Sequence, residues 1–408
     1  MSEPPKEKDH WFQDMLIYGP MAALFPVIAI IAILSGLLLP ALSAAKRKAQ
    51  KQVVVYAAQD QVYAETILRE FEKETGIRIK AVYDSEAVKS VGLANRLLAE
   101  KNHPQCDVFW GNEEMRTRQL AGQGVFRETN GWAAFGYRSR RVVINTNFIA
   151  LAEPTPHPSK EGSNVLLRGV ASSHPGRGQG WVAPRSLLEL TNEIWRGKVA
   201  LAFPQFGTTA THFHALRQLW GEERWLAWCR ALAANKPFVV DGNSVVVKFV
   251  ARGEAWIGLT DSDDIAAGQR EALPIAVLDG RARHSVRADD PPDGNGAHGV
   301  PRPTTDLVTE TLLIPNTVAV IRNAPHPANA QRLFEYLQHR EVAEKLVQAD
   351  ALESSEGRVI RVPESTTETK VRDSHSSSLR EKALKPDWDA LLRDLETTTK
   401  QLNEIFLR

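Results

Sequence analysis

Strands and helices alternate over residues 53–110, and this order constrains the fold more than any other feature of the sequence. The run Val53-Val-Val-Tyr-Ala57 is continuously apolar, which is typical of a strand buried on both faces. Apolar residues then recur at helical spacing over 62–75 and stop at Gly76, a residue that favours a helix end. The pattern continues with a predicted strand, helix and strand at 77–83, 91–101 and 106–110. Short connections between such elements predict a parallel α/β sheet with right-handed crossovers.

Polar residues follow each of these three strands, where the chain turns towards the next helix. Ligands of parallel sheets bind beyond the carboxyl ends of the strands, so these positions are candidate ligand contacts. They are Gln59 and Asp60 after the first strand, Ser85 after the second, and Asn112 and Glu113 after the third.

Further strands and helices of the same α/β type are predicted in the rest of the chain. Strands are expected at 142–145, 199–203, 238–240, 255–259 and 311–321, and helices at 208–219, 222–234, 244–252, 327–339, 340–350 and 387–406. Two stretches between them, 153–184 and 279–306, are rich in Pro and Gly and are predicted to be long loops.

Residues 15–45 carry no charged side chain, and their apolar part is long enough for a helix to cross a bilayer core of roughly 30 Å. We therefore predict a leader over 1–51 with a hydrophobic membrane segment at 15–45. An uncleaved signal-anchor fits the length of this segment. A cleaved signal peptide is the alternative, because small residues near 43–45 resemble a cleavage site.

The charges around this segment leave its orientation open. Lys46, Arg47, Lys48 and Lys51 follow it, and the positive-inside rule alone would place the large C-terminal part in the cytoplasm. Long domains are translocated despite such a bias, so the charges do not decide the topology.

Charge and motif content exclude several classes of function. The 408 residues include 50 basic and 49 acidic side chains, and this balance gives no sign of a nucleic-acid-binding surface. Two cysteines, Cys106 and Cys229, are too few for a disulfide framework or a zinc site. No paired base and nucleophile are visible in the sequence, so we expect no enzymatic activity and no nucleic-acid partner.

Two predicted helices begin with residues that suit an anion. The first begins near Thr208, Thr209 and Ala210, in a stretch rich in hydroxyl groups and in backbone N–H groups without partners. The second begins near Asn243 and Ser244. Helix N-termini of this kind bind anions, although a threonine that only caps its helix is the alternative.

Three acids, Asp261, Asp263 and Asp264, come directly after the predicted strand at 255–259. Carboxylates this close repel one another unless they are solvated or bind a cation. Asp in the first turn of a helix is also an ordinary feature of helix starts, so the acids alone leave both interpretations open.

Several segments resemble extracellular solute-binding proteins of the ferric-iron ABC transporter type, in the same order along the chain. In the first half they are Val54-Val-Tyr-Ala-Ala58, Glu70-Phe-Glu-Lys-Glu-Thr-Gly76, Tyr83-Asp-Ser-Glu86 and Asp107-Val-Phe-Trp-Gly-Asn-Glu113. In the second half they are Val240-Asp-Gly-Asn-Ser244, Gly258-Leu-Thr-Asp-Ser-Asp-Asp264 and Leu313-Ile-Pro-Asn-Thr317.

The resemblance implies a type II periplasmic binding protein fold, an α/β fold of two lobes joined by a hinge. An N-terminal transmembrane or signal-anchor helix would precede it here. Lobe 1 is expected at 52–147 and 312–355, and lobe 2 at 148–311 and 356–408, with 153–184 and 279–306 as insert loops.

The resemblance also implies ligand-binding residues, but with departures. Ferric binders of this type hold the metal with a His after the first strand, a Glu after the third, and a Tyr-Tyr pair near the strand that returns to the hinge. Here Gln59 or Asp60 stands at the His position, Glu113 is kept, and Thr260-Asp-Ser-Asp-Asp264 replaces the tyrosines.

The implied metal ligands are therefore Glu113, Asp261, Asp263 and Asp264, which suit a hard cation such as Fe³⁺, Ca²⁺ or Mn²⁺. The synergistic-anion site of the family resembles Thr208, Thr209 and Ala210 together with Asn243 and Ser244.

The implied function is that of the solute-binding component of an ABC importer, which captures a small ligand by hinge closure and delivers it to a permease in the cytoplasmic membrane. A ferric ion with a synergistic anion is one candidate ligand, and a phosphonate-like anion or a small organic solute is another. A membrane-tethered ligand sensor is the alternative role. No resident cofactor is implied, and the expected location is extracytoplasmic, either anchored by the N-terminal helix or secreted after cleavage.

Overall fold

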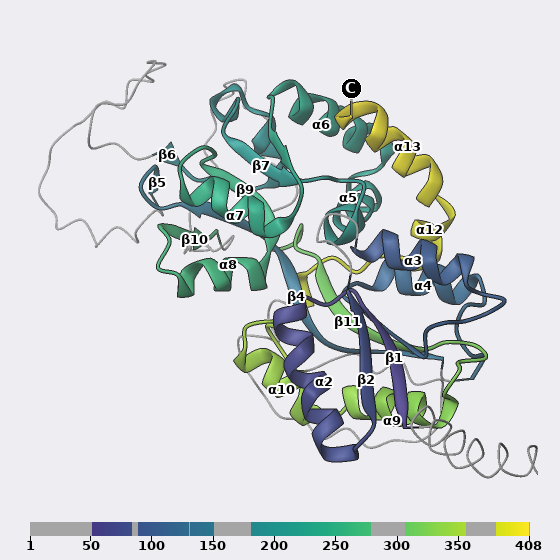
Figure 1. Ribbon diagram of the computed structural model, residues 1–408. Coiled ribbons are helices and arrows are strands. Elements are labelled where there is room, and N and C mark those ends of the chain that lie inside the picture. The colour runs from purple at the N-terminus through teal and green to yellow at the C-terminus, as the bar shows by residue number, and fades with distance from the viewer. Residues whose placement is uncertain are drawn as a thin grey trace, which may run out of the picture.

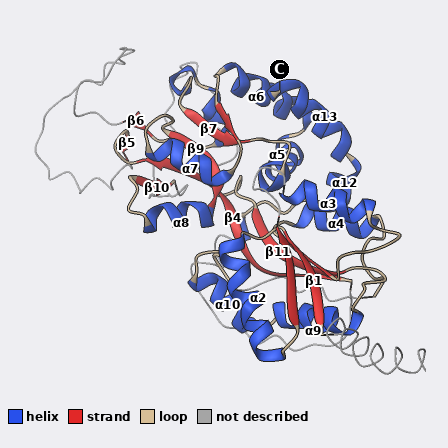
Figure 2. Ribbon diagram, in the orientation of Figure 1, coloured by secondary structure: helices blue, strands red, loops and turns tan. Residues whose placement is uncertain are grey.

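A mixed sheet forms the centre of the molecule. The structure, a computed structural model, describes residues 51–83, 89–129, 131–150, 181–278, 307–355 and 381–407. Within these residues the main sheet has nine strands in the order β2-β1-β3-β11-β4-β9-β7-β8, and β10 pairs with β4 (Figure 1, Figure 2). A short pair of strands, β5 and β6, lies outside this sheet.

The strands and helices have the following bounds. The strands are β1 (Gln52–Ala57), β2 (Arg78–Tyr83), β3 (Val108–Gly111), β4 (Trp132–Asn145), β5 (Ile149–Ala150), β6 (Trp181–Val182), β7 (Val199–Ala202), β8 (Phe238–Val240), β9 (Ile257–Asp261), β10 (Ile275–Val277) and β11 (Leu313–Val320). The α-helices are α2 (Gln61–Thr75), α3 (Lys89–Ala99), α4 (Glu114–Gly122), α5 (Gly207–Trp220), α6 (Glu222–Ala234), α7 (Asn243–Ala251), α8 (Ser262–Arg270), α9 (Pro327–Leu337), α10 (Arg340–Gln348), α12 (Trp388–Arg393) and α13 (Leu395–Phe406). Two short 3₁₀ helices, η1 (Leu187–Thr191) and η2 (Glu193–Trp195), precede β7.

Strands β2, β1, β3 and β11, with helices α2, α3, α4, α9 and α10, form what we call the β1 side. Strand β1 pairs in parallel with β2 and with β3, as the alternating pattern predicts. Strand β11 pairs antiparallel with β3 and with β4, so the sheet as a whole is mixed rather than parallel.

Helix α2 shows how the local sequence produces this side. Its buried residues are Ala64, Ile67, Leu68 and Phe71, the apolar positions at helical spacing. The helix ends at Gly76, which adopts φ 65° and donates its N–H to the carbonyl of Glu72. A residue with a Cβ is strained in this left-handed conformation, which explains the glycine at this position.

Strands β9, β7, β8 and β10, with helices α5 to α8, form the β9 side. Strand β7 pairs in parallel with β8 and β9. The three largest apolar clusters do not cross between the sides: one is built from residues of β1, β3, α2 and α9, and the other two from residues of β7, β9, α5, α6 and α7.

Strand β4 belongs to both sides. Its first part pairs with β11 up to the pair Leu313 and Ser139, and its last part pairs with β9 from Arg140 and Asp261 onwards. The prediction of a strand at 142–145 alone is therefore wrong, because β4 begins ten residues earlier, at Trp132. Arginines interrupt the apolar pattern of this strand, so the pattern does not predict its first part. Arg138 and Arg140 are nevertheless buried, because each pairs with a buried acid.

The C-terminal segment contacts both sides. The single helix predicted at 387–406 is two helices, because the chain leaves the helical path at Asp394 between α12 and α13. The guanidinium of Arg118 on α4 lies over the ring of Trp388, while Arg217 on α5 forms an ion pair with Asp394 at 2.6 Å. Helices α12 and α13 therefore link α4 to α5 along one edge of the molecule (Figure 1).

Several sequence predictions fall outside the described residues. They are the membrane segment at 15–45, Ser85, and nearly all of the insert loops at 153–184 and 279–306. Among the described helices, none has the length and apolar character required to span a membrane. The lobe boundaries expected from the sequence stay a prediction.

Candidate functional site in a pocket between the two sides

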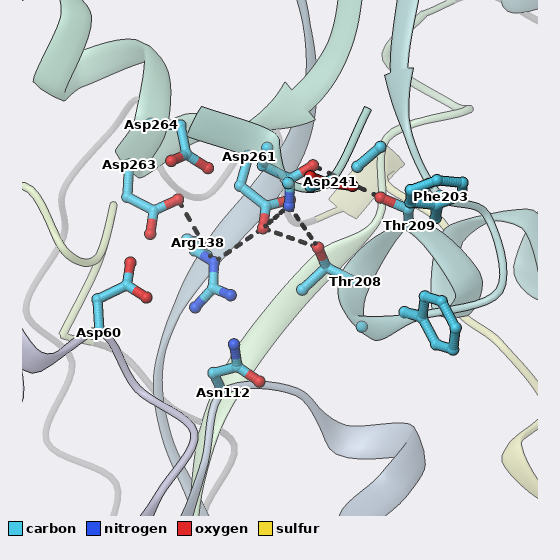
Figure 3. Close-up of a pocket in the computed structure, with 15 residues that line it drawn as sticks. Asp60, Asn112, Arg138, Phe203, Thr208, Thr209, Asp241, Asp261, Asp263 and Asp264 are labelled. Atoms are coloured by element: carbon cyan, nitrogen blue, oxygen red, sulfur yellow. Dashed lines mark hydrogen bonds and ion pairs between the residues drawn. The ribbon is translucent and has the colours of Figure 1, made fainter. Parts of the chain in front are cut away.

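One pocket, with a volume of about 540 Å³ that is partly open to solvent, is lined by both sides of the molecule (Figure 3). It lies at the carboxyl ends of β1, β3, β7, β8 and β9, where ligands of open α/β sheets bind. Its lining consists of Asp60, Asn112 and Arg138 from the β1 side and β4, and of Ala202, Phe203, Phe206, Gly207, Thr208, Thr209, Asp241, Gly242, Asn243, Asp261, Asp263 and Asp264 from the β9 side.

Two helices of the β9 side begin at this pocket. Helix α5 begins at Gly207 and α7 at Asn243, and neither receives a hydrogen bond from a capping side chain. The cap residue of α5 is Phe206, so the alternative of a threonine that only caps this helix is wrong. The first N–H groups of a helix lack acceptors within the helix, so both helix starts present donors and a positive partial charge.

Asp261, at the end of β9, is the most heavily bonded group of the pocket. It is 2 % exposed, and Oδ1 accepts a hydrogen bond from Arg140 Nη1 at 2.7 Å. Oδ2 accepts hydrogen bonds from the Thr208 hydroxyl at 2.8 Å, from Asn243 Nδ2 at 3.1 Å and from Arg138 Nε at 3.3 Å. Both carboxylate oxygens are therefore occupied by donors of this chain.

Arg138 and Arg140 supply the positive charge beneath the acids. Their side chains are 4 % and 0 % exposed, and both contact Asp261. Burial alone would raise the pKa of Asp261, but the charges of Arg140 and Arg138 outweigh it and lower the pKa below its usual value. Asp261 is thus an ionised counterion of two buried arginines, which makes it part of the scaffold.

Asp263, in the first turn of α8, has a different environment. It is 6 % exposed, and its Oδ1 lies 3.4 Å from Arg138 Nε but has no hydrogen-bond partner within the described residues. Burial raises the pKa of Asp263 to about 6, against the opposing charge of Arg138, and the negative charge of Asp261 adds to the rise. The charge of an ionised Asp263 is therefore only partly compensated, by Arg138 and by backbone N–H groups at the start of α8.

Asp264 and Asp60 complete an acidic wall. Ligand atoms of Asp261, Asp263 and Asp264 lie within 4.8 Å of one another, a spacing that suits a metal ion. Figure 3 shows Asp60 facing Asp263 from the β1 side, with Arg138 beside both of them and Asn112 below. Besides Asp261, which the arginines engage, Asp60, Asp263 and Asp264 place carboxylates in the lining of the pocket.

The structure brings most of the predicted site residues together. Those that line the pocket are Asp60, Asn112, Thr208, Thr209, Asn243, Asp261, Asp263 and Asp264. They come from five different connections between strands and helices, and their convergence follows from the shared edge of the sheet.

Four other predicted residues do not line the pocket, and Ser85 lies outside the described residues. Glu113 caps α4: it is 1 % exposed, accepts a hydrogen bond from the N–H of Arg116 at 2.9 Å, and accepts another from the Thr211 hydroxyl at 3.1 Å. Burial raises the pKa of Glu113. Gln59 is buried, Ala210 packs with Met115, and Ser244 lies within the first turn of α7.

Arg138 and Arg140 are the functional residues that the sequence predictions missed. A signal was present, because Tyr137-Arg-Ser-Arg-Arg141 places three cations beside the apolar run 142–144. Cations on a buried strand require buried acids as partners, and the acid cluster at 261–264, directly after a predicted strand, was a candidate.

Comparison with known proteins agrees with this geometry. A family model described as bacterial extracellular solute-binding protein matches residues 52–349, which is most of the chain. The chain belongs to this family. The resemblance to ferric-iron-binding periplasmic proteins stated from the sequence is confirmed, and membership places this solute-binding protein outside the cytoplasm.

Individual relatives of this solute-binding protein are distant. The Fe(3+)-binding periplasmic protein of Serratia marcescens is 26 % identical over 56 % of this chain. The chain spans less than two thirds of the length of the curated relatives that it matches, at 64 % and 62 %.

Solved structures show the same fold. Iron-bound HitA from Pseudomonas aeruginosa has a TM-score of 0.60 and 16 % identity, and the match covers 86 % of this chain and 99 % of HitA. The periplasmic binding protein AfuA from Actinobacillus pleuropneumoniae, with fructose-6-phosphate bound, also has a TM-score of 0.60 and 16 % identity, over 87 % and 98 %. These likenesses establish the periplasmic binding protein fold of this chain.

Proposed function

We propose that this solute-binding protein is the capture component of an ABC importer, which closes its two sides over a small solute and delivers it to a permease. The observation that carries the proposal is a pocket lined from both sides, with Asp60 and Asn112 on one and Asp263 and Asp264 on the other. A solute that contacts both walls binds the closed form better than the open one, and this difference shifts the chain towards closure.

For the solute, we propose a hard cation. Four carboxylates line the pocket besides Asp261, those of Asp60, Asp241, Asp263 and Asp264, whereas Arg138 is the one cationic side chain of the described lining. Oxygen ligands of this kind suit Fe³⁺, Ca²⁺ or Mn²⁺. Relatives named for ferric ion support this choice.

A second candidate is a small phosphate ester, and it rests on different residues. The buried guanidinium of Arg138 and the N-terminal amides of α5 and α7 form the donor part of the pocket. Phosphate oxygens bind such donors, while the carboxylates could accept hydrogen bonds from sugar hydroxyls. The bound fructose-6-phosphate named for AfuA supports this alternative.

The test is a thermal-shift measurement on the purified chain with ferric citrate, Ca²⁺, Mn²⁺, fructose-6-phosphate and unphosphorylated fructose. We expect a cation to raise the melting temperature, and we expect the double variant D263N/D264N to bind that cation at least tenfold more weakly, since two ligand carboxylates are lost. Asp389 offers a matched control, because it is an exposed acid in the first turn of α12, away from the pocket.

The outcomes separate the candidates. Stabilisation by fructose-6-phosphate but not by fructose or cations would favour the phosphate ester. Equal loss of cation binding in D263N/D264N and D389N would show a nonspecific charge effect and contradict the proposed cation site.

A further inference from the structure

An arginine at the end of α8 adds a contact between the β9 side and the β1 side, besides those that α5 makes with α4. Arg270, the last residue of α8 on the β9 side, bonds to the residues that directly follow α10 on the β1 side. Its Nη1 forms an ion pair with the carboxylate of Asp350 and donates a hydrogen bond to the carbonyl of Ala349 at 3.1 Å. Its Nη2 donates to the hydroxyl of Tyr63 on α2 at 3.4 Å.

The acceptors on the β1 side form a defined receptor for this guanidinium. Ala349 directly follows the last residue of α10, and the carbonyl groups at a helix C-terminus carry a negative partial charge that attracts a cation. Asp350 adopts φ 60°, a left-handed conformation that Asp tolerates better than most residues. The end of α10 and the turn that follows it thus hold the carbonyl of Ala349 and the carboxylate of Asp350 against the guanidinium of Arg270.

The contact is connected to the pocket through both helices. Helix α8 begins at Ser262, between the pocket residues Asp261 and Asp263, and ends at Arg270. Helix α2 begins at Gln61, directly after the pocket residue Asp60, and carries Tyr63 in its first turn. A movement of the two sides that widens the pocket between Asp60 and Asp263 would also separate Arg270 from Tyr63 and Asp350.

We propose that Arg270 is a latch, whose bonds to Asp350, Ala349 and Tyr63 form only when the two sides are closed and which biases the chain towards the closed state. The latch rests on the proposed function in that it acts on the closure that captures the solute. Arg270 and Asp350 are 47 % and 44 % exposed, and an exposed ion pair shifts an equilibrium by about two- to fivefold. The latch is therefore weak enough to open whenever solute is released.

The experiment measures the distance between the two sides without any solute. Spin labels are attached to the full chain at Lys73→Cys on α2 and Lys248→Cys on α7, two exposed positions on opposite sides. The native Cys106 and Cys229 are buried, and they stay unlabelled. Pulsed electron–electron double resonance then gives the distribution of distances between the two spin labels. The ratio of closed to open molecules is obtained from this distribution.

Two variants remove the latch. Arg270→Gln removes the cation, and Asp350→Asn removes the carboxylate while keeping a residue that tolerates the left-handed backbone. Each is expected to lower the ratio of closed to open molecules about two- to fivefold, and the double variant should lower it no further, because both changes remove the same bond. Arg252→Gln is the matched control, since Arg252 is 66 % exposed and pairs with Glu254 within the β9 side.

An unchanged distance distribution in Arg270→Gln overturns the latch, and so does an equal shift in Arg252→Gln. Because no solute is present, failure of the latch is distinguishable from failure of the proposed function, which the thermal-shift screen tests separately.

Discussion

Replacing Arg140 with Met is expected to lower the free energy of unfolding by about 3–5 kcal/mol, the usual cost of removing one partner of a buried ion pair. Arg140 is fully buried, and its Nη1 bonds Asp261 at 2.7 Å and Asn243 at 2.8 Å. Methionine has a similar length but no charge, so Asp261 would remain buried with Arg138 as its remaining cation, at 3.3 Å. Equilibrium urea denaturation of the full chain measures the change.

Neighbouring residues provide the controls for this variant. Arg141→Met removes an adjacent cation that pairs with Glu353 at 3.2 Å nearer the surface, and we expect a loss below about 1 kcal/mol. Arg140→Lys keeps the charge and should restore part of the stability. If Arg140→Met costs no more than Arg141→Met, the two buried arginines are not the counterions that hold Asp261 in place.

Replacing Asp263 with Asn is expected to stabilise the solute-free protein at neutral pH, and to do so only above about pH 4. In the folded protein burial raises the pKa of Asp263 to about 6, whereas in the unfolded chain the carboxyl titrates near 3.8. The folded state therefore binds more protons than the unfolded state between these pH values. The stability that this group contributes is fully present below pH 3.8 and is lost as the pH rises through 6.

The size of this effect follows from the difference between the two pKa values. A difference of about two pKa units corresponds to about 3 kcal/mol of stability at pH 7.5. Wild type and Asp263→Asn should have similar free energies of unfolding at pH 4, and the variant should be more stable at pH 7.5. A constant difference between the two proteins across this range would show that Asp263 is not the titrating group.

The two variants also distinguish two acids that the sequence alone presents as equivalent. From the sequence, Asp261 and Asp263 are equivalent members of one acid cluster. In the structure Asp261 is neutralised by Arg140 and Arg138, so its removal leaves two buried cations without their partner. The charge of Asp263 is compensated only in part, by Arg138 at 3.4 Å, and therefore the pair Asp263 and Asp264 is the cleaner probe of ligand binding.

Local patterns predicted the first part of the fold well. The apolar run of β1, the helical spacing of α2 and its end at Gly76 depend on residues close in sequence, and each lies where it was expected. Strand β4 was predicted only over its last four residues, because Arg138 and Arg140 break the apolar pattern. Their burial depends on contacts with Asp261, which lies 121 or more residues further along the chain. A pattern of neighbouring residues cannot predict such a contact.

The candidate site was predicted in part for the same reason. Strand ends and helix starts are visible in the sequence, and eight of the residues chosen on that basis line the pocket. Whether a side chain at a strand end faces the pocket or caps its own helix depends on one torsion and on its neighbours. Glu113 turns to the N–H of Arg116 and to Thr211, whereas the adjacent Asn112 lines the pocket.

The position of β11 between β3 and β4 has a consequence for how the chain folds. The β9 side is built mainly from one continuous stretch, 140–278, so its strands can pair as soon as that stretch is complete. The β1 side cannot close its sheet until 313–320 is inserted between strands that were made some two hundred residues earlier. Contacts of such long separation form late, because the loop between them must first be closed. The part of the molecule that comes first along the chain is therefore the part expected to be completed last.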